Sequence, residues 1–151
     1  MYDSTHDTIA HIAMVRMYLD KLERAIRKRG RYHDLSKMEE PELAIFDEYT
    51  PKLQDSTYGS DEYKEFLSEM SVAIEHHYKE NRHHPEHHED GISGMDLVDL
   101  IEMISDWKAA TLRHANGDIY KSIEINQGRF KYGDELKQIF LNTVDNHFKD
   151  I

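Results

Sequence analysis

The chain has 151 residues, the size of one domain, and its net charge of −11 without a basic stripe argues against binding DNA or RNA. It has no cysteine, so disulfides and thiolate metal sites are excluded and any metal must be held by His, Asp and Glu. No apolar run is long enough for a membrane span, and the N-terminus lacks a signal-peptide pattern, so we expect a soluble, cytoplasmic protein without membrane contact.

Apolar residues recur at steps of three and four along most of the chain, which predicts amphipathic helices. The expected helices run from about Ser4 to Gly30, from Pro41 to Tyr49, from Asp61 to Asn81, from Met95 to His114 and from Asp134 to Phe148. No alternation typical of strands, no internal repeat and no dividing linker is present. The sequence therefore predicts an all-α fold in a single domain over residues 1–151.

The segment HDLSK, residues 33–37, is the first candidate for chemistry. The imidazole of His33 and the carboxylate of Asp34 could both reach one cation, and Lys37 could then contact a phosphate oxygen. The dipeptide alone is weak evidence, because His6-Asp7 repeats it. Spacing leaves a second interpretation open, in which Asp34 only caps a helix N-terminus.

Two further residues have both a structural and a chemical interpretation. His11 lies at the edge of the apolar face of the first expected helix, where it is either a packed core residue or a metal ligand. Asp106 lies beside Trp107 in the most apolar helix. Unless it faces solvent, a carboxylate there needs an ion pair or a metal to offset its desolvation.

Six of the eleven histidines lie in EHHYKENRHHPEHHEDG, residues 75–91. His76 and His77 fall at the end of the third expected helix, whereas His83, His84, His87 and His88 surround Pro85 in a loop. By its spacing, this segment is either a solvated histidine-rich loop or part of a metal site.

Taken in order, these motifs resemble the HD superfamily of metal-dependent phosphohydrolases, which is all-helical. HDLSK and the tandem histidine before a glycine-containing loop are similar to motifs of its HD-GYP branch. HDLSK, NRHHPEHH, GISGMDL, EMISDWKAA and KSIEINQGRF also resemble an uncharacterised HD-like family that is frequent in phage and bacterial genomes. The resemblance implies a compact, HD-domain-like helical bundle.

The resemblance also implies divalent metal ions, two in number, and a ligand set of His, Asp and Glu suits Mn, Fe, Mg, Ni or Zn. It assigns His11, His33, Asp34 and Asp106 to the first ion. It assigns His77 and His84 to the second ion, with His76 or His83 as substitutes. The GYP triplet is replaced by GISG, which argues against cyclic di-GMP as substrate, and Lys37 stands where related deoxynucleotidases carry Glu, which favours a two-metal mechanism.

The implied function is hydrolysis of a small anionic phosphoester, a nucleotide or cyclic nucleotide, by metal-activated water. Asp34 or Asp106 would orient the water, and Lys37 would neutralise phosphoryl oxygens. The expected substrate contacts are Lys37, Asn81, Arg82, Arg113 and Trp107, the last either stacking a base or packing in the core. Two alternatives stay open, an HD-type di-iron oxygenase and a non-catalytic, metal-stabilised module that binds a nucleotide or partner. The oligomeric state is open too, a homo-oligomer included.

Overall fold

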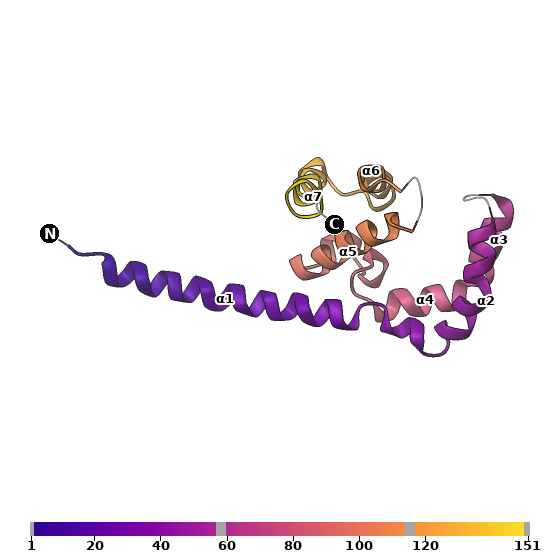
Figure 1. Cartoon of the computed structure of the whole chain (residues 1–151), viewed down its shortest axis with the longest axis horizontal. Helices are drawn as coiled ribbons and strands as arrows, with labels where there is room; N and C mark the ends of the chain where they lie inside the picture. Colours follow the sequence, from indigo (N-terminus) through magenta and orange to yellow (C-terminus); the bar gives the residue numbers. More distant parts are fainter. Residues whose placement is uncertain (1, 57–59, 114–116, 150–151) are drawn as a thin grey trace. The chain divides into compact units, whose positions relative to one another are not determined.

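The computed structural model describes residues 2–56, 60–113 and 117–149 (Figure 1). The described residues form α-helices and short 3-10 helices and contain no strand, so the prediction of an all-α fold is confirmed. In chain order the elements are α1 (Thr5–Tyr32), η1 (Leu35–Met38), α2 (Glu42–Asp55), α3 (Asp61–Glu69), α4 (Ser71–Glu80), η2 (Pro85–His87), η3 (Gly91–Gly94), α5 (Leu97–Thr111), α6 (Ile119–Phe130) and α7 (Asp134–His147). None of the described helices is both long enough and apolar enough to cross a membrane.

The chain divides into two units, Met1–His33 and Asp34–Ile151. The first unit consists essentially of α1, a helix of 28 residues in which no residue is buried. The second unit contains every other element. The expectation of one domain over residues 1–151 stays a prediction.

The main core of the second unit lies between α5, α6 and α7. Its buried members are Met103, Ile104, Ile119, Ile123, Tyr132, Phe140 and Val144. Trp107 packs against this cluster, with its ring stacked near Phe130 at a centroid distance of 6.3 Å. Of the two interpretations given for Trp107, the structure therefore supports packing in the core.

Two predicted helices differ from the observed ones. The helix expected from Asp61 to Asn81 is interrupted at buried Met70, and the resulting α3 and α4 both pack against α2. A helix running straight through Met70 would have to leave that surface. The helix expected to stop at Tyr49 continues to Asp55, with Pro51 inside it.

Two boundaries in the C-terminal half follow from capping. Asp96 accepts hydrogen bonds from the backbone N–H of Val98 and Asp99, so α5 begins at Leu97 rather than Met95. The predicted end at His114 lies outside the described residues. Helix α6 is not among the predicted helices; it begins where Asp118 accepts hydrogen bonds from the backbone N–H of Tyr120 and Lys121.

Candidate metal centre

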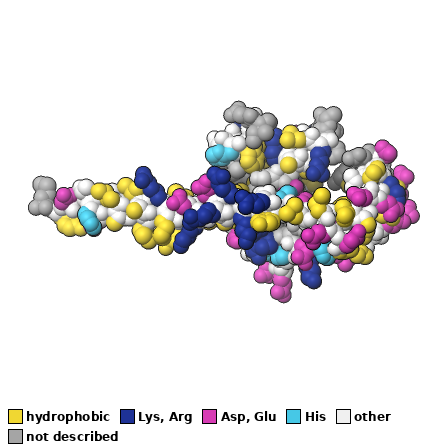
Figure 2. All heavy atoms as spheres, turned by 60° about the horizontal axis from the view of Figure 1, so that its bottom comes forward, with side chains coloured by type: hydrophobic (Ala, Val, Ile, Leu, Met, Phe, Trp, Pro, Cys, Tyr) yellow, Lys and Arg dark blue, Asp and Glu magenta, His cyan; other side chains and the backbone are white. Residues whose placement is uncertain are grey.

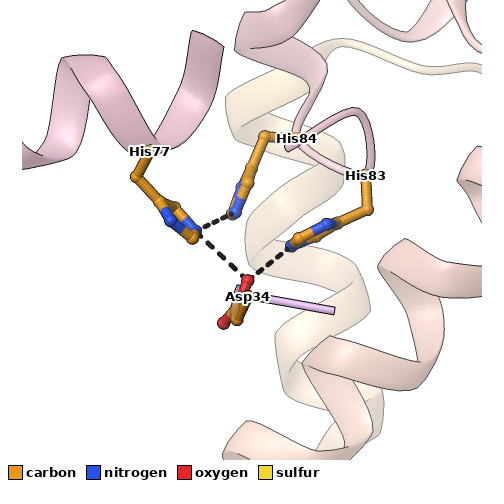
Figure 3. Close-up of side chains that lie close together, drawn as sticks. All are labelled: Asp34, His77, His83 and His84. Atoms are coloured by element: carbon orange, nitrogen blue, oxygen red, sulfur yellow. Dashed lines mark hydrogen bonds and ion pairs between the residues drawn. The ribbon is translucent and has the colours of Figure 1, made fainter. Parts of the chain in front are cut away.

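Four side chains of the second unit bring potential metal ligands together. Asp34, His77, His83 and His84 each place one ligand atom within 4.8 Å of all the others (Figure 3). Asp34 directly precedes η1, His77 lies on α4, and the tandem pair His83-His84 lies in the loop between α4 and η2. The structure thus joins the HDLSK motif to the histidine-rich segment, although Asp34 and His77 are 43 positions apart in sequence.

The distances within this cluster match those between ligands of one ion. Oδ1 of Asp34 lies 3.3 Å from Nε2 of His77 and 3.5 Å from Nε2 of His83. Nε2 of His77 lies 2.9 Å from Nε2 of His84. Ligands held at about 2.0–2.1 Å from a tetrahedral ion are separated by about 3.3 Å, so little movement would be needed to accept one.

Two of the three imidazoles have a carboxylate close to Nδ1, on the side of the ring away from the cluster. Nδ1 of His77 lies 2.8 Å from Oε2 of Glu42, and Nδ1 of His83 lies 3.3 Å from Oε1 of Glu102. With the proton on Nδ1, where these carboxylates can accept it, each ring has an Nε2 lone pair that faces the cluster. This is the arrangement that orients metal-bound histidines in proteins.

Glu42 is fully buried and serves two histidines at once. Its second oxygen lies 2.8 Å from Nδ1 of His76, whose side chain is 35% exposed. Burial raises the pKa of Glu42, but hydrogen bonds from His76, Ser36 and His77 outweigh this and hold the pKa below its usual value. Glu42 is therefore ionised at neutral pH, and His76 supports Glu42 rather than joining the cluster.

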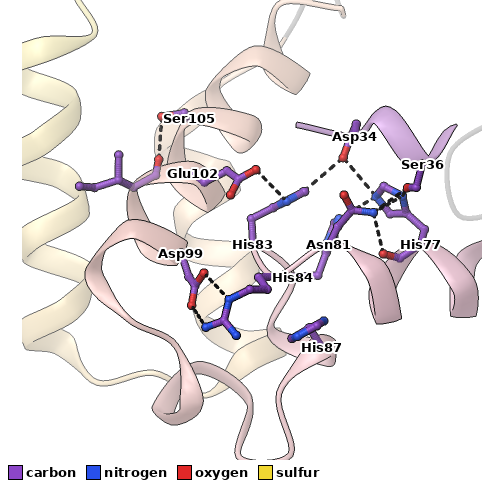
Figure 4. A network of polar contacts seen from close by, with 12 residues as sticks. Asp34, Ser36, His77, Asn81, His83, His84, His87, Asp99, Glu102 and Ser105 are labelled. Atoms are coloured by element: carbon purple, nitrogen blue, oxygen red, sulfur yellow. Dashed lines mark hydrogen bonds and ion pairs between the residues drawn. The ribbon is translucent and has the colours of Figure 1, made fainter. Parts of the chain in front are cut away.

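Asn81 braces the backbone and ring of His77 (Figure 4). Its side-chain amide donates to Oγ of Ser36 at 2.8 Å and to the carbonyl of His77 at 2.9 Å. Oγ of Ser36 in turn lies 3.4 Å from Nδ1 of His77. Asn81 therefore helps to position His77, and its predicted contact with the substrate stays a prediction.

His84 is kept neutral by its surroundings. Burial lowers the pKa of His84 to about 3, with help from neighbouring His83 and His77, while Asp106 and Asp34 oppose the shift. Its ring packs against Tyr78 at a centroid distance of 4.9 Å. A neutral imidazole is the form that binds metals, so its protonation state suits a ligand.

The two oxygens of Asp34 face different groups. Oδ1 faces the histidines, whereas Oδ2 accepts a hydrogen bond from Nζ of Lys37 at 2.7 Å. Asp34 stands at the N-cap position of η1, but its side chain caps no backbone N–H among the described residues. The capping interpretation of Asp34 therefore fails. Asp106, half-buried on α5, brings a carboxylate oxygen within 4.8 Å of one from Asp34, as the prediction for both residues requires.

The remaining predicted residues have other surroundings. The guanidinium of Arg82 makes a two-point contact with fully buried Asp99, at 2.8 and 3.2 Å. Arg113 is exposed just after α5. His11 is exposed on α1 and His33 follows that helix, both in the first unit, so their ligand roles stay predictions.

The two carboxylates that contact the histidines, Glu42 and Glu102, are not among the residues predicted from the sequence. Glu102 could have been found, because it precedes Asp106 by four residues and so shares its face of α5. Glu42 opens α2 and has no comparable local signal.

Comparison with protein-family models gives one assignment. The model described as a family of unknown function (DUF5662) matches residues 1–151, so the chain belongs to this family. The curated proteins and the solved structures yielded no match. Any function assigned to the chain must therefore be argued from the site itself.

Proposed function

We propose that this member of the DUF5662 family is a metal-dependent hydrolase that cleaves a small phosphoester, with a nucleotide or cyclic nucleotide as the expected substrate. The observation that carries the proposal is the convergence of Nε2 of His77 and His83 on Oδ1 of Asp34, each histidine backed at Nδ1 by a carboxylate. Carboxylates placed against Nδ1 of two inward-facing histidines are typical of metal-bound imidazoles and not of a solvated histidine-rich loop.

The ligand set proposed for the ion is Asp34, His77, His83 and His84. Three imidazoles and one carboxylate favour Zn, Fe, Ni or Mn over Mg, which prefers oxygen ligands throughout. When bound, such an ion supplies Lewis acidity and lowers the pKa of coordinated water. A second ion, as the resemblance to HD phosphohydrolases implies, would need donors beyond these four, and Asp106 is the nearest candidate in the second unit.

The other groups supply proton transfer and charge. Asp106 is a half-buried carboxylate beside Asp34, so it can accept a proton from the attacking water. Lys37 is 34% exposed at its side chain, so its ammonium can donate to a non-bridging phosphoryl oxygen while staying close to Asp34. On a chain of net charge −11, an anionic substrate requires such local positive charge.

The test begins with metal analysis of protein purified without added metal. The apoprotein is then reloaded with Zn, Fe, Ni, Mn or Mg and assayed on phosphomonoesters, phosphodiesters, nucleotides and cyclic nucleotides. We expect stoichiometric metal and hydrolysis that depends on it, both lost in Asp34→Ala and retained in His87→Ala, a matched variant from the same histidine-rich segment.

Two results would replace the proposal. A metal-loaded protein that binds nucleotides but leaves every phosphoester intact would be a binding module. An iron-loaded protein that consumes O₂ with a substrate would be an oxygenase using the same ligands.

A further inference from the structure

His84 is supported differently from the other two histidines of the proposed ligand set. Its Nε2 points at Nε2 of His77, 2.9 Å away (Figure 3). Among the described residues, however, no carboxylate lies within hydrogen-bond distance of its Nδ1, whereas His77 and His83 each have a carboxylate close to that atom. His84 also lies in a loop rather than on an α-helix. Something other than a hydrogen bond to an anion must therefore orient its ring.

The ring of Tyr78 supplies this support. Tyr78 follows His77 on α4, and its ring centroid lies 4.9 Å from that of His84, with the two planes inclined at 50°. The other rings against His84 in the described part of the chain are those of His77 and His83, at 4.8 and 4.1 Å. Both belong to the cluster itself. Tyr78 is thus the aromatic residue that confines His84 from outside the cluster.

Tyr78 is in turn held by Arg129 of α6. Nη2 of Arg129 donates one hydrogen bond to the Tyr78 hydroxyl, at 3.3 Å, and another to Oε1 of Glu86, on η2. Its guanidinium lies 4.7 Å from the centroid of the neighbouring Phe130 ring, which packs against the core between α5, α6 and α7. These contacts connect the loop that carries His84 to the main core of the second unit.

An ordinary surface ion pair is the alternative explanation for Arg129. Figure 2 shows acidic and basic side chains on the surface of the second unit, where a single ion pair usually contributes little. The side chains of Arg129 and Glu86 are 54 and 28% exposed, so their attraction by itself would be weak. The hydrogen bond to Tyr78 goes beyond this alternative, because a guanidinium that only neutralises Glu86 has no need of the phenol.

We propose that Tyr78 is a positioning residue for His84 and that Arg129 fixes the Tyr78 ring through its hydroxyl. Packing then does for this histidine what the carboxylates do for the other two. Without the Tyr78 ring, the imidazole could rotate away from the cluster, and an ion would have to order it again on binding, so the ion would bind less tightly. The inference rests on the metal centre of the proposed function but not on phosphoester hydrolysis.

The test measures the affinity of the full chain for Zn²⁺ by competition with a chelator. We expect Tyr78→Leu to lower this affinity by about tenfold. In a His84→Ala background the same substitution should have no further effect, because the residue through which Tyr78 acts is gone. The matched control is Tyr120→Leu, which removes a tyrosine whose hydroxyl donates to Asp145 and so also joins two helices. It should leave the affinity unchanged.

Loading with Co²⁺ gives a second measurement. The visible absorption of protein-bound Co²⁺ depends on the number and type of its ligands. Tyr78→Leu should therefore shift the wild-type spectrum toward that of His84→Ala, which a merely structural role of Tyr78 would not do.

Two milder variants test the hydrogen bond and keep the Tyr78 ring position filled, so that they also serve if Tyr78→Leu does not fold. Tyr78→Phe and Arg129→Met each remove the hydrogen bond that fixes the ring. Each should lower the affinity for Zn²⁺ by about threefold, and the double variant should lose no more than either single variant, because both remove the same interaction.

Equal losses of affinity in the wild-type and His84→Ala backgrounds would overturn the proposal, since Tyr78 would then act on the fold and not through His84. So would an unchanged affinity in every Tyr78 variant. A wild type that binds neither Zn²⁺ nor Co²⁺ would overturn this inference together with the metal centre on which it rests. Metal binding without hydrolysis of any phosphoester would overturn only the hydrolase, and the Tyr78 comparison would still decide this inference.

Discussion

Oε2 of Glu42 lies 2.8 Å from Nδ1 of His77, and the Glu42 side chain has no exposed surface. Glu42→Gln keeps the size of the side chain but removes the negative charge that fixes the histidine tautomer. We expect the affinity for the bound metal to fall by about 10- to 100-fold. Competition with a chelator measures this. Glu48→Gln, an exposed position on the same helix, is the control and should bind metal normally. Equal affinities in the two variants would show that Glu42 only fills space.

The histidine-rich segment, residues 75–91, allows two histidine variants to be compared. His83→Ala removes an imidazole that is 1% exposed and points Nε2 at Asp34, so metal content should fall well below stoichiometric. His87→Ala removes a histidine whose Nδ1 lies 3.2 Å from the carbonyl of Tyr78, and metal content should be retained. Elemental analysis measures the metal content of both variants. Equal losses of metal in the two would indicate adventitious binding rather than a ligand cluster.

Lys37 allows binding of the substrate to be separated from binding of the metal. Lys37→Met keeps much of the apolar stem that places the ammonium 5.3 Å from the centroid of the Phe46 ring, but removes the charge. We expect kcat/KM for the phosphoester to fall by about tenfold or more while metal content is unchanged. Lys52→Met, which removes a cation bound to Glu48 on α2, is the control. A loss of metal in Lys37→Met would instead assign Lys37 to the support of Asp34.

Most of the helices can be predicted from the sequence because the signals for a helix are local. Periodicity and caps lie within one helix, so α1, α5 and α7 were predicted with small errors at their ends. The break at Met70 could not be predicted, because it depends on the packing of α3 and α4 against α2. By contrast, α6 does have a local signal, in the Asp118 cap and the spacing of Ile119 and Ile123, from which it could have been predicted.

The candidate site likewise has some features that the sequence predicts and others that depend on contacts between distant segments. The residue types with the strongest metal chemistry, Asp34 and the histidines of residues 75–91, can be recognised from composition and order. Which histidine turns inward is decided by contacts between distant segments, such as that of Glu42 with His77. For this reason the sequence predicts His83 only as a substitute ligand and does not separate His76 from His77. The pairing of Arg82 with Asp99 is a contact of this kind as well.

The contact of Arg82 with Asp99 predicts a loss of stability when it is broken. Asp99 is fully buried, and Arg82→Ala would leave its charge without the guanidinium that now meets it at 2.8 Å. We expect the free energy of unfolding to fall by about 2 kcal/mol or more. Adding Asp99→Asn should recover part of this loss, because the buried charge is then gone. Urea denaturation followed by the fluorescence of Trp107, the single tryptophan, measures both variants. If Arg82→Ala lowered hydrolase activity but left the free energy of unfolding unchanged, Arg82 would instead be assigned to substrate binding.

Tyr132 predicts how the core responds to alkaline pH. Its hydroxyl donates to the carbonyl of Ile123 at 2.6 Å, and burial raises its pKa from 10.0 to about 12. The folded state therefore holds this proton more tightly than the unfolded state. The stabilisation is complete below pH 10.0 and declines between pH 10.0 and about 12, by up to about 1.4 kcal/mol per pH unit.

Tyr132→Phe isolates this effect, because the other tyrosines titrate equally in both proteins. Below pH 10.0 the wild type should be more stable by about 1 kcal/mol, the contribution of the hydrogen bond to Ile123. As the pH rises toward 11, the unfolded wild type ionises at Tyr132 and the variant cannot, so the advantage should shrink and then reverse. Urea denaturation of the two proteins at matched pH values gives the difference directly. A difference that stays constant over this range would mean that the Tyr132 hydroxyl titrates normally and is reached by solvent in the folded protein.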